Sequence, residues 1–218
     1  MSAAELLEPA LAERVLARAL AHGGEFAEVI AERRGGLTLA IDESRIESVQ
    51  VGSEDGAGVR VLSGGTTYFA HVDGLDPADL ERAADEAAAA LRAERVEPRP
   101  LRAEAPAPLP IERPPGDVPA ARKAELLREL DERARGEGGE IVQAMASYGE
   151  ARREVAVANS AGLLSGDDRT RVRIGAQAVA RRGDRIETGA ETLGGHRGFE
   201  LFVAAGRLIE LAGKRSRS

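Results

Sequence analysis

The distribution of proline constrains this sequence of 218 residues more than any other feature. Eight of the ten prolines lie between Pro98 and Pro119. Proline lacks a backbone N–H and fixes its own φ angle, so residues 94–119 cannot form a regular helix or an interior strand. We therefore predict an extended, Pro-rich linker over residues 94–119. It joins two predicted lobes, which span residues 1–93 and residues 120–218.

The first lobe has the pattern of strands enclosed by two helices. Apolar residues recur at four-residue steps over Leu7–Ala19, which predicts a helix. Short alternating runs over Phe26–Val72 predict four or five strands, with a tight turn at Gly64-Gly65. Asp76-Pro77 combines a favourable N-cap residue with a proline at the first helical position. This pair predicts a second helix that runs to about Ala93.

The second lobe repeats the same order of elements. Ala120–Arg135 has the periodicity of a helix, and Ile141–Thr192 contains alternating runs typical of strands, with a turn at Asn159–Gly162. A final helix is predicted from the stripe formed by Phe199, Phe202, Leu208 and Ile209. We therefore predict an α+β fold of two lobes, each with antiparallel strands flanked by helices, joined by the Pro-rich linker.

Composition and charge exclude several classes of function. The formal net charge is −7, so the chain repels phosphate backbones and we expect no nucleic-acid partner. The only dense basic run, Lys214–Arg217, is interpreted as a solvated tail. No apolar run approaches the roughly 18–20 residues that span a bilayer, and Met1–Leu20 lacks the pattern of a signal peptide. Because the chain also has no cysteine, we expect a cytoplasmic protein with no membrane partner.

The three histidines do not form a recognisable metal motif. His22, His71 and His196 are far apart in the sequence, and none has a His or Glu at the ligand spacing of a metal-binding helix. We expect His22 at the C-terminal end of a helix, His71 on one face of a strand and His196 in a glycine-rich turn. A zinc site assembled from distant residues is the less favoured alternative.

Other catalytic patterns are equally incomplete. Ser160 and Ser165 lie near turns without a G-x-S-x-G motif. Gly52–Gly58 is rich in glycine but lacks the lysine of a phosphate-binding loop, so it is interpreted as a loop between strands. Two carboxylate pairs, Asp167-Asp168 and Asp184 with Glu187, are interpreted as solvated surface groups. No catalytic, cofactor-binding or metal-binding residue is therefore assigned in this chain.

The predicted strand edges remain as a candidate for binding. Antiparallel sheets with glycine-rich turns expose edges that accept an extended peptide as an additional strand. The alternative is an edge protected by its many Arg and Glu side chains.

Three motifs, in this order, resemble a known family. They are Gly56–Val61, followed by a glycine turn, an aromatic strand and the Asp76-Pro77 helix start; Asn159–Gly162, after the Pro-rich linker; and Gly194–Glu200. This series is similar to the first two segments of the TldD/PmbA family, from about Phe26 to about Leu211. The order and spacing of the motifs carry the resemblance, because each motif alone is weakly specific.

The resemblance implies a cytoplasmic zinc metallopeptidase system that acts on unfolded and small modified peptides, built as a homo- or heterodimer of related subunits. In the family, two His of an H-E-x-x-x-H motif bind zinc and its Glu is the general base. This chain lacks that motif, so the zinc expected in the full-length family member is not expected here. We expect the N-terminal part of a metallopeptidase, inactive alone. The alternatives are a peptide-binding or dimer-partner module and a truncated, non-functional fragment.

Overall fold

The computed structural model describes residues 3–94, 96–107, 109–136 and 140–203 of the chain. Contacts within the chain define two compact units, each made of three separated stretches. Unit 1 comprises Met1–Arg34, Ser53–Pro108 and Arg153–Arg169, and unit 2 comprises Gly35–Gly52, Leu109–Arg152 and Thr170–Ser218. These interleaved units differ from the two continuous lobes expected from the prolines. The division of the sequence into segments 1–93, 94–119 and 120–218 stays a prediction.

Long strands explain why the units are interleaved. Each of four strands contributes one segment to unit 1 and another to unit 2; they are β1 (Phe26–Asp42), β2 (Arg45–Ser63), β5 (Ile141–Asn159) and β6 (Leu163–Arg182). The prediction of four or five short strands over Phe26–Val72 is therefore wrong, because β1, β2 and β3 (Thr66–Asp73) account for this region. Glycines that resembled strand ends in the sequence lie inside strands whose backbone is paired with neighbours.

The strands form a sheet with the order β3-β2-β1-β5-β6-β4, and β7 (Arg185–Gly195) pairs with β6. The pairs β2–β3 and β6–β7 are antiparallel. The short strand β4 (Arg102–Glu104) pairs in parallel with β6 at the end of the strand order. Its edge position agrees with the exclusion of an interior strand from residues 94–119. The mixture of helices with a mainly antiparallel sheet confirms the α+β class.

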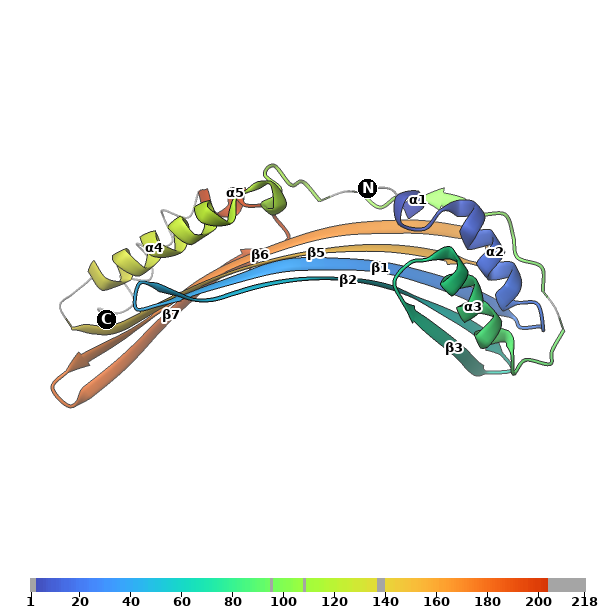
Figure 1. Ribbon diagram of the computed structural model, residues 1–218, viewed down its shortest axis with the longest axis horizontal. Coiled ribbons are helices and arrows are strands. Elements are labelled where there is room, and N and C mark those ends of the chain that lie inside the picture. Colours follow the sequence, from blue (N-terminus) through green and yellow to red (C-terminus); the bar gives the residue numbers. More distant parts are fainter. Residues whose placement is uncertain (1–2, 95, 108, 137–139, 204–218) are drawn as a thin grey trace. The chain divides into compact units, whose positions relative to one another are not determined.

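Unit 1 has an alanine-rich core beneath a pair of helices. The helices α2 (Pro9–Ala19) and α3 (Pro77–Ala88) cover one face of its strands (Figure 1). The short helix α1 (Ala3–Leu6) precedes α2. Strand residues on that face alternate with exposed ones, as expected when one face of a sheet is buried. The strand residues in this core are Ala27, Val29, Ala31, Ala57, Val59, Val61, Ala70, Val72, Ala156, Ala158 and Leu164.

The α3 helix begins where the sequence predicts. The Asp76 carboxylate accepts a hydrogen bond from the Ala78 N–H at 2.9 Å, as an N-cap side chain does. The helix ends at Ala88 rather than near Ala93. Residues beyond the helix instead bond to the segment that follows α2. The Ala93 N–H donates to the His22 carbonyl, and the Glu94 carbonyl accepts from the Gly24 N–H.

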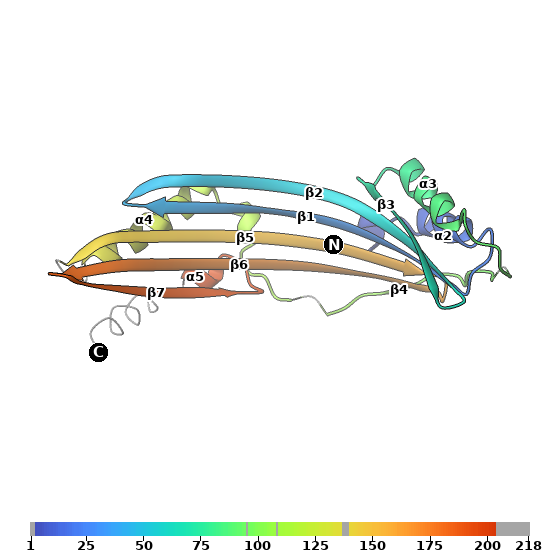
Figure 2. The same ribbon diagram turned by 90° about the horizontal axis from the view of Figure 1, so that it is seen from below.

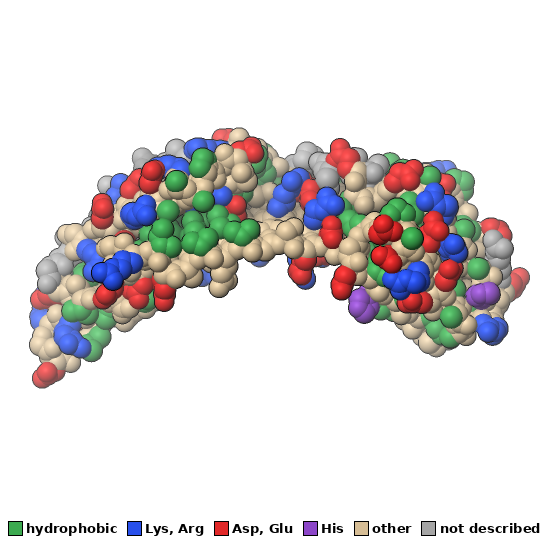
Figure 3. Space-filling view, viewed as in Figure 1, with side chains coloured by type: hydrophobic (Ala, Val, Ile, Leu, Met, Phe, Trp, Pro, Cys, Tyr) green, Lys and Arg blue, Asp and Glu red, His purple; other side chains and the backbone are tan. Residues whose placement is uncertain are grey.

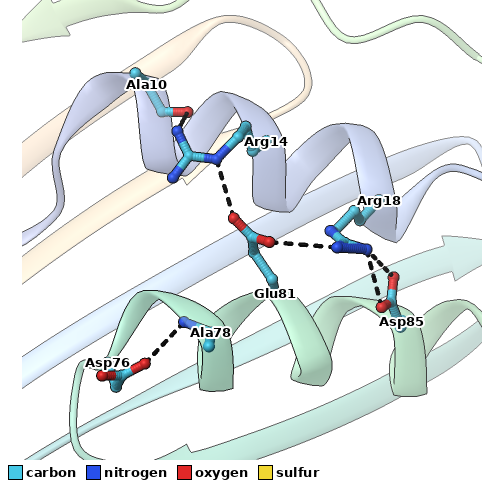
Figure 4. A network of polar contacts seen from close by, with 7 residues as sticks. All are labelled: Ala10, Arg14, Arg18, Asp76, Ala78, Glu81 and Asp85. Carbon is cyan, nitrogen blue, oxygen red and sulfur yellow. Dashed lines mark hydrogen bonds and ion pairs between the residues drawn. The ribbon is translucent and has the colours of Figure 1, made fainter.

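Exposed ion pairs join α2 to α3 (Figure 4). Arg14 lies 3.0 Å from Glu81, and Arg18 contacts both Glu81 at 3.3 Å and Asp85 at 3.1 Å. The space-filling view shows acidic and basic side chains intermingled over these helices (Figure 3). Pairs this exposed contribute little stability individually, so the apolar core beneath them holds the two helices on the sheet.

Unit 2 has a separate core that contains three aromatic residues. The helices α4 (Ala120–Gly136) and α5 (Glu200–Val203) cover one face of its strands (Figure 1), and η1 (Pro115–Asp117) precedes α4. Tyr148, Phe199 and Phe202 are buried together, with ring centroids 5.7 to 6.2 Å apart. The predicted helical positions Leu208 and Ile209, and the basic run Lys214–Arg217, lie outside the described residues.

Within the described ranges, no helix combines the length and the apolar character needed to cross a lipid bilayer.

Candidate functional site

The three histidines lie in separate surroundings. His22 is exposed just beyond the end of α2, and His71 is exposed on β3, where its ring stacks on Phe69 at 6.0 Å. His196 follows β7, and its Nε2 lies 3.2 Å from Nη2 of Arg171. Across the described ranges, no three His, Asp or Glu side chains converge in a way that would hold a metal ion. These residues therefore do not fit a zinc centre, and we assign no catalytic step to them.

The candidate nucleophiles have structural roles. Ser160 is buried, its Oγ accepts a hydrogen bond from the Ala27 N–H at 3.0 Å, and its own N–H donates to the Ala27 carbonyl at 2.9 Å. Ser165 lies in β6, paired with Glu104 of β4. The turn interpretation of Ser160 is thus supported by its bonds, which fix the Asn159–Gly162 turn against β1.

One member of each carboxylate pair forms an ion pair with a neighbouring arginine. Asp167 forms an ion pair with Arg169, and Glu187 forms one with Arg185 at 2.5 Å. Asp168 also has a partner, and Asp184 is exposed in the turn between β6 and β7. The structure therefore does not bring these carboxylates together as an acid–base pair.

The glycine-rich stretch Gly52–Gly58 is not the loop that the sequence suggested, because it lies inside β2. Ion pairs of Arg34 with Glu54 and of Arg33 with Asp55 connect its acidic residues to β1. Gly56 is close to the neighbouring strand, since a Cβ there would lie 2.9 Å from the Val72 carbonyl oxygen. The acidic residues and glycines in this stretch therefore lie in a strand that contacts its neighbours, and they do not form a phosphate-binding loop.

An unpaired strand edge is the feature most suited to binding. β3 pairs with β2 only over Gly56–Ser63, and the Gly74 N–H donates to the Asp55 carbonyl at 2.9 Å. No strand in the described part of the chain pairs with the outer side of β2 before Asp55 (Figure 2). We call Arg45–Gly52 the β2 edge, and all of these residues belong to unit 2.

The β2 edge exposes aliphatic side chains on both faces. Ile46, Val49 and Val51 are 46%, 56% and 78% exposed, respectively. β-Branched residues favour an extended backbone, and alternate N–H and C=O groups of an edge strand point away from the sheet. The edge can therefore accept a further strand, and its exposed aliphatic groups would pack against alternate side chains of that strand. The sequence indicated strand edges in general, but Val49 and Val51 resembled a short, separate strand.

The Gly194–Glu200 motif forms a carboxylate anchor. Glu200 accepts hydrogen bonds from the N–H groups of Gly198 at 2.7 Å and Arg113 at 2.9 Å. Burial favours the neutral carboxyl, but the combined backbone N–H donors outweigh it and lower the pKa of Glu200. A Cβ at Gly198 would lie 2.3 Å from both the Arg113 carbonyl oxygen and Glu200 Oε2, so glycine is required there. The motif therefore fixes the start of α5 against the segment before α4.

A buried charged pair lies beneath α4. Lys123 Nζ is 2.7 Å from Glu150 Oε2, which also accepts a hydrogen bond from the Tyr148 hydroxyl at 2.6 Å. The side chains of Lys123 and Glu150 are only 3% and 12% exposed. Burial, together with Glu150, raises the pKa of Tyr148 well above its usual range. Each charge therefore has a partner within unit 2, and we assign no ligand to this group.

Comparisons with known families agree with the order of the motifs. A family model described as PmbA/TldA metallopeptidase domain 1 matches residues 27–91, and one described as the PmbA/TldA metallopeptidase central domain matches residues 113–218. The two models follow each other along this chain as the first and second parts of one metallopeptidase architecture. The chain belongs to the PmbA/TldD metallopeptidase family.

Individual relatives support the same assignment. A protein named Metalloprotease from Methanothermobacter thermautotrophicus is 30% identical over 203 residues, which cover 88% of this chain and 42% of that protein. The structure of TldE from Thermococcus kodakarensis has a TM-score of 0.73 and 17% identity, and the match covers 94% of this chain and 46% of that one. The structure of a putative modulator of DNA gyrase from Bacteroides thetaiotaomicron also has a TM-score of 0.73 and 17% identity. That match covers 95% of this chain and 49% of the other. The two solved structures show a shared fold, and this chain spans less than half the length of each relative.

Proposed function

We propose that this chain is the N-terminal, peptide-holding part of a PmbA/TldD-type zinc metallopeptidase. Its role is to bind an extended substrate, and the zinc ligands and general base are supplied by another part of the protein or by a related subunit. The match to the first and central domains supports the enzyme class. The proposal also includes a related subunit as a dimer partner.

The β2 edge is the observation that carries the peptide-holding role. A peptidase for unfolded peptides must recognise backbone more than particular side chains, and hydrogen bonds to a strand edge provide this recognition. The β2 edge offers backbone groups that no described strand pairs with, and the exposed Val49 and Val51. Glu47, between the exposed aliphatic residues, is the kind of charged residue that limits uncontrolled association of edge strands.

Fluorescence anisotropy with an uncharged, labelled peptide of about ten residues, rich in Val and Thr, tests this role. We expect the chain to bind the peptide and the V49K/V51K variant to lose at least about tenfold in affinity. A V142K/I186K variant is the matched control, because Val142 and Ile186 are similarly exposed at 49% and 56% but lie outside the β2 edge. The same peptide with N-methyl groups on alternate amides should not bind. Equal binding of both peptides, or an unaffected V49K/V51K variant, contradicts the proposal.

Two further measurements distinguish this role from its competitors. If size exclusion shows a dimer that V49K/V51K dissociates while peptide does not bind, the edge is a subunit interface and the peptide-holding role is wrong. The purified 218-residue chain with added zinc should not cleave the peptide. Chelator-sensitive cleavage by this chain alone would overturn the division of labour that we propose.

A further inference from the structure

The β6–β7 ladder separates its charges between the two faces of the sheet. Val172 pairs with Gly195 and Arg182 with Arg185, with every residue between them in register. Directly paired residues of antiparallel strands place their side chains on the same face, and successive residues alternate. Val172 and Ile174 are buried in the unit 2 core, so even-numbered β6 residues face the helices. Odd-numbered β6 residues and their partners lie on the opposite face, which none of the described helices covers and which we call the helix-free face.

The helix-free face of this ladder carries positive charge and no carboxylate between its ends. Its β6 positions are Arg173, Gly175, Gln177, Val179 and Arg181, and their β7 partners are Gly194, Thr192, Ala190, Thr188 and Ile186. Both β7 glutamates, Glu187 and Glu191, pair with alanines on the helix side. One step beyond the paired register, Arg171 contacts His196 at 3.2 Å, and Arg197 follows it as another exposed residue.

The arginines on the two faces differ in their partners. On the helix side, Arg182 pairs with Glu140 and Arg185 with Glu187, each at 2.5 Å. Within the described part of the chain, neither Arg171 nor Arg173 has a carboxylate within ion-pair distance, and both are exposed. The contact of Arg171 with His196 brings no carboxylate to the guanidinium, so it does not neutralise the charge of Arg171. In a chain of net charge −7, this is a local excess of unpaired positive charge.

We propose that Arg171 and Arg173, with His196 and Arg197 beside them, form a subsite for carboxylates of an acidic extended peptide. The inference rests on the proposed peptide-holding function and adds a preference for substrate sequence. Because β1 and β5 lie between β2 and β6, this subsite takes a different part of the substrate from the part that pairs with the β2 edge. Residues two apart in a strand are separated by about 6.6 Å, so this arginine pair matches acidic side chains two apart in an extended peptide. Gly194, opposite Arg173, adds no side chain to this part of the face.

The composition of the face favours peptide over nucleic acid. Proteins that bind single-stranded nucleic acids combine positive charge with aromatic side chains on which bases stack. The face from Arg171 to Arg181 and its β7 partners contain no Phe, Tyr or Trp. Charge-assisted hydrogen bonds between guanidinium and carboxylate groups therefore remain as the chemistry that the face offers.

Anisotropy with a labelled ten-residue peptide containing Glu-Thr-Glu tests the subsite on the 218-residue chain. We expect this peptide to bind at least about fivefold more tightly than its Gln-Thr-Gln analogue, and this preference to weaken as salt screens the charges. The R171Q/R173Q variant should lose the preference and retain binding of the uncharged analogue. The R182Q/R185Q variant removes the same charge from the other face of the same strands, and should keep the preference.

The outcomes separate this inference from the function on which it rests. If acidic and uncharged peptides bind equally to the unmodified chain, the subsite is wrong and the peptide-holding role stands. If neither peptide binds, the peptide-holding role fails as well. A preference that disappears when the peptide C-terminus is amidated assigns the site to the terminal carboxylate and contradicts recognition of side chains. Tighter binding of a uridine decamer, lost in R171Q/R173Q, would make the face a nucleic-acid site and overturn the inference.

Discussion

Lys123 and Glu150 show at the scale of single residues how unit 2 tolerates buried charge. Lys123→Met removes the positive partner and leaves Glu150, 12% exposed, with the hydrogen bond from the Tyr148 hydroxyl. Breaking a buried pair on one side typically costs about 3 kcal/mol or more. We expect this loss in the free energy of unfolding, measured with urea. The double variant K123M/E150Q should recover most of it, and equal losses in both variants would contradict the account.

Gly198 permits the anchor formed by Glu200. Gly198→Ala places a Cβ against the Arg113 carbonyl and the Glu200 carboxylate, which cannot both move without losing their hydrogen bonds. We expect a loss of about 2 kcal/mol in unfolding free energy. Gly149→Ala is the control, because a Cβ at Gly149 meets no atom within 4 Å. A G198A variant as stable as G149A would show that the close contact relaxes at no cost.

Glu200 makes the stability of unit 2 depend on pH. Its pKa is lowered in the folded protein, so its ionised form contributes stability above the unfolded pKa. That contribution is lost as the pH falls through the lowered pKa of the folded protein and the carboxylate is protonated. Glu200→Gln should therefore be less stable than the unmodified chain at pH 7 and lose less between pH 6 and pH 3, as measured by urea unfolding. Parallel pH profiles for the two proteins would remove this role.

The start of α3 is a test at the scale of elements. The Asp76 side chain caps this helix by accepting a hydrogen bond from the Ala78 N–H in the first turn. Asp76→Ala should lower the unfolding free energy of unit 1 by about 1 kcal/mol, and Asp76→Asn should lower it by much less because the amide oxygen keeps the bond. The midpoints of thermal unfolding measured by circular dichroism provide the comparison. Equal effects of Ala and Asn would contradict capping by this side chain.

Local signals in the sequence predicted helices and turns better than strands. Asp76-Pro77 and Gly64-Gly65 fix their elements through backbone geometry within a few residues, and both predictions are confirmed. Strand length depends on partners that are distant in the sequence. Gly52 resembles a strand end in the sequence, yet β2 continues through it because β1 pairs alongside. The alternation of residues within each stretch therefore predicted several short strands in place of the two long strands β1 and β2.

At the scale of the whole molecule, the family was identifiable from the sequence and the β2 edge was not. The order of Gly56–Val61, Asn159–Gly162 and Gly194–Glu200 indicated the family, which the matches to its first and central domains confirm. The β2 edge follows from where β3 stops pairing, and no residue near Val49 or Val51 encodes that. Likewise, the separation of charge between Arg173 and Glu187 appears only once the register of β6 and β7 is known.

Hydrogen–deuterium exchange of the 218-residue chain, with and without a saturating uncharged peptide, tests the central claim most directly. Strand addition supplies partners to backbone N–H groups that otherwise exchange with water, so exchange should slow in the segment that contains Arg45–Asp55. The N-methylated peptide should leave that segment unchanged. Protection confined to other segments, or no protection by either peptide, would contradict the assignment of the β2 edge as the surface that holds the substrate.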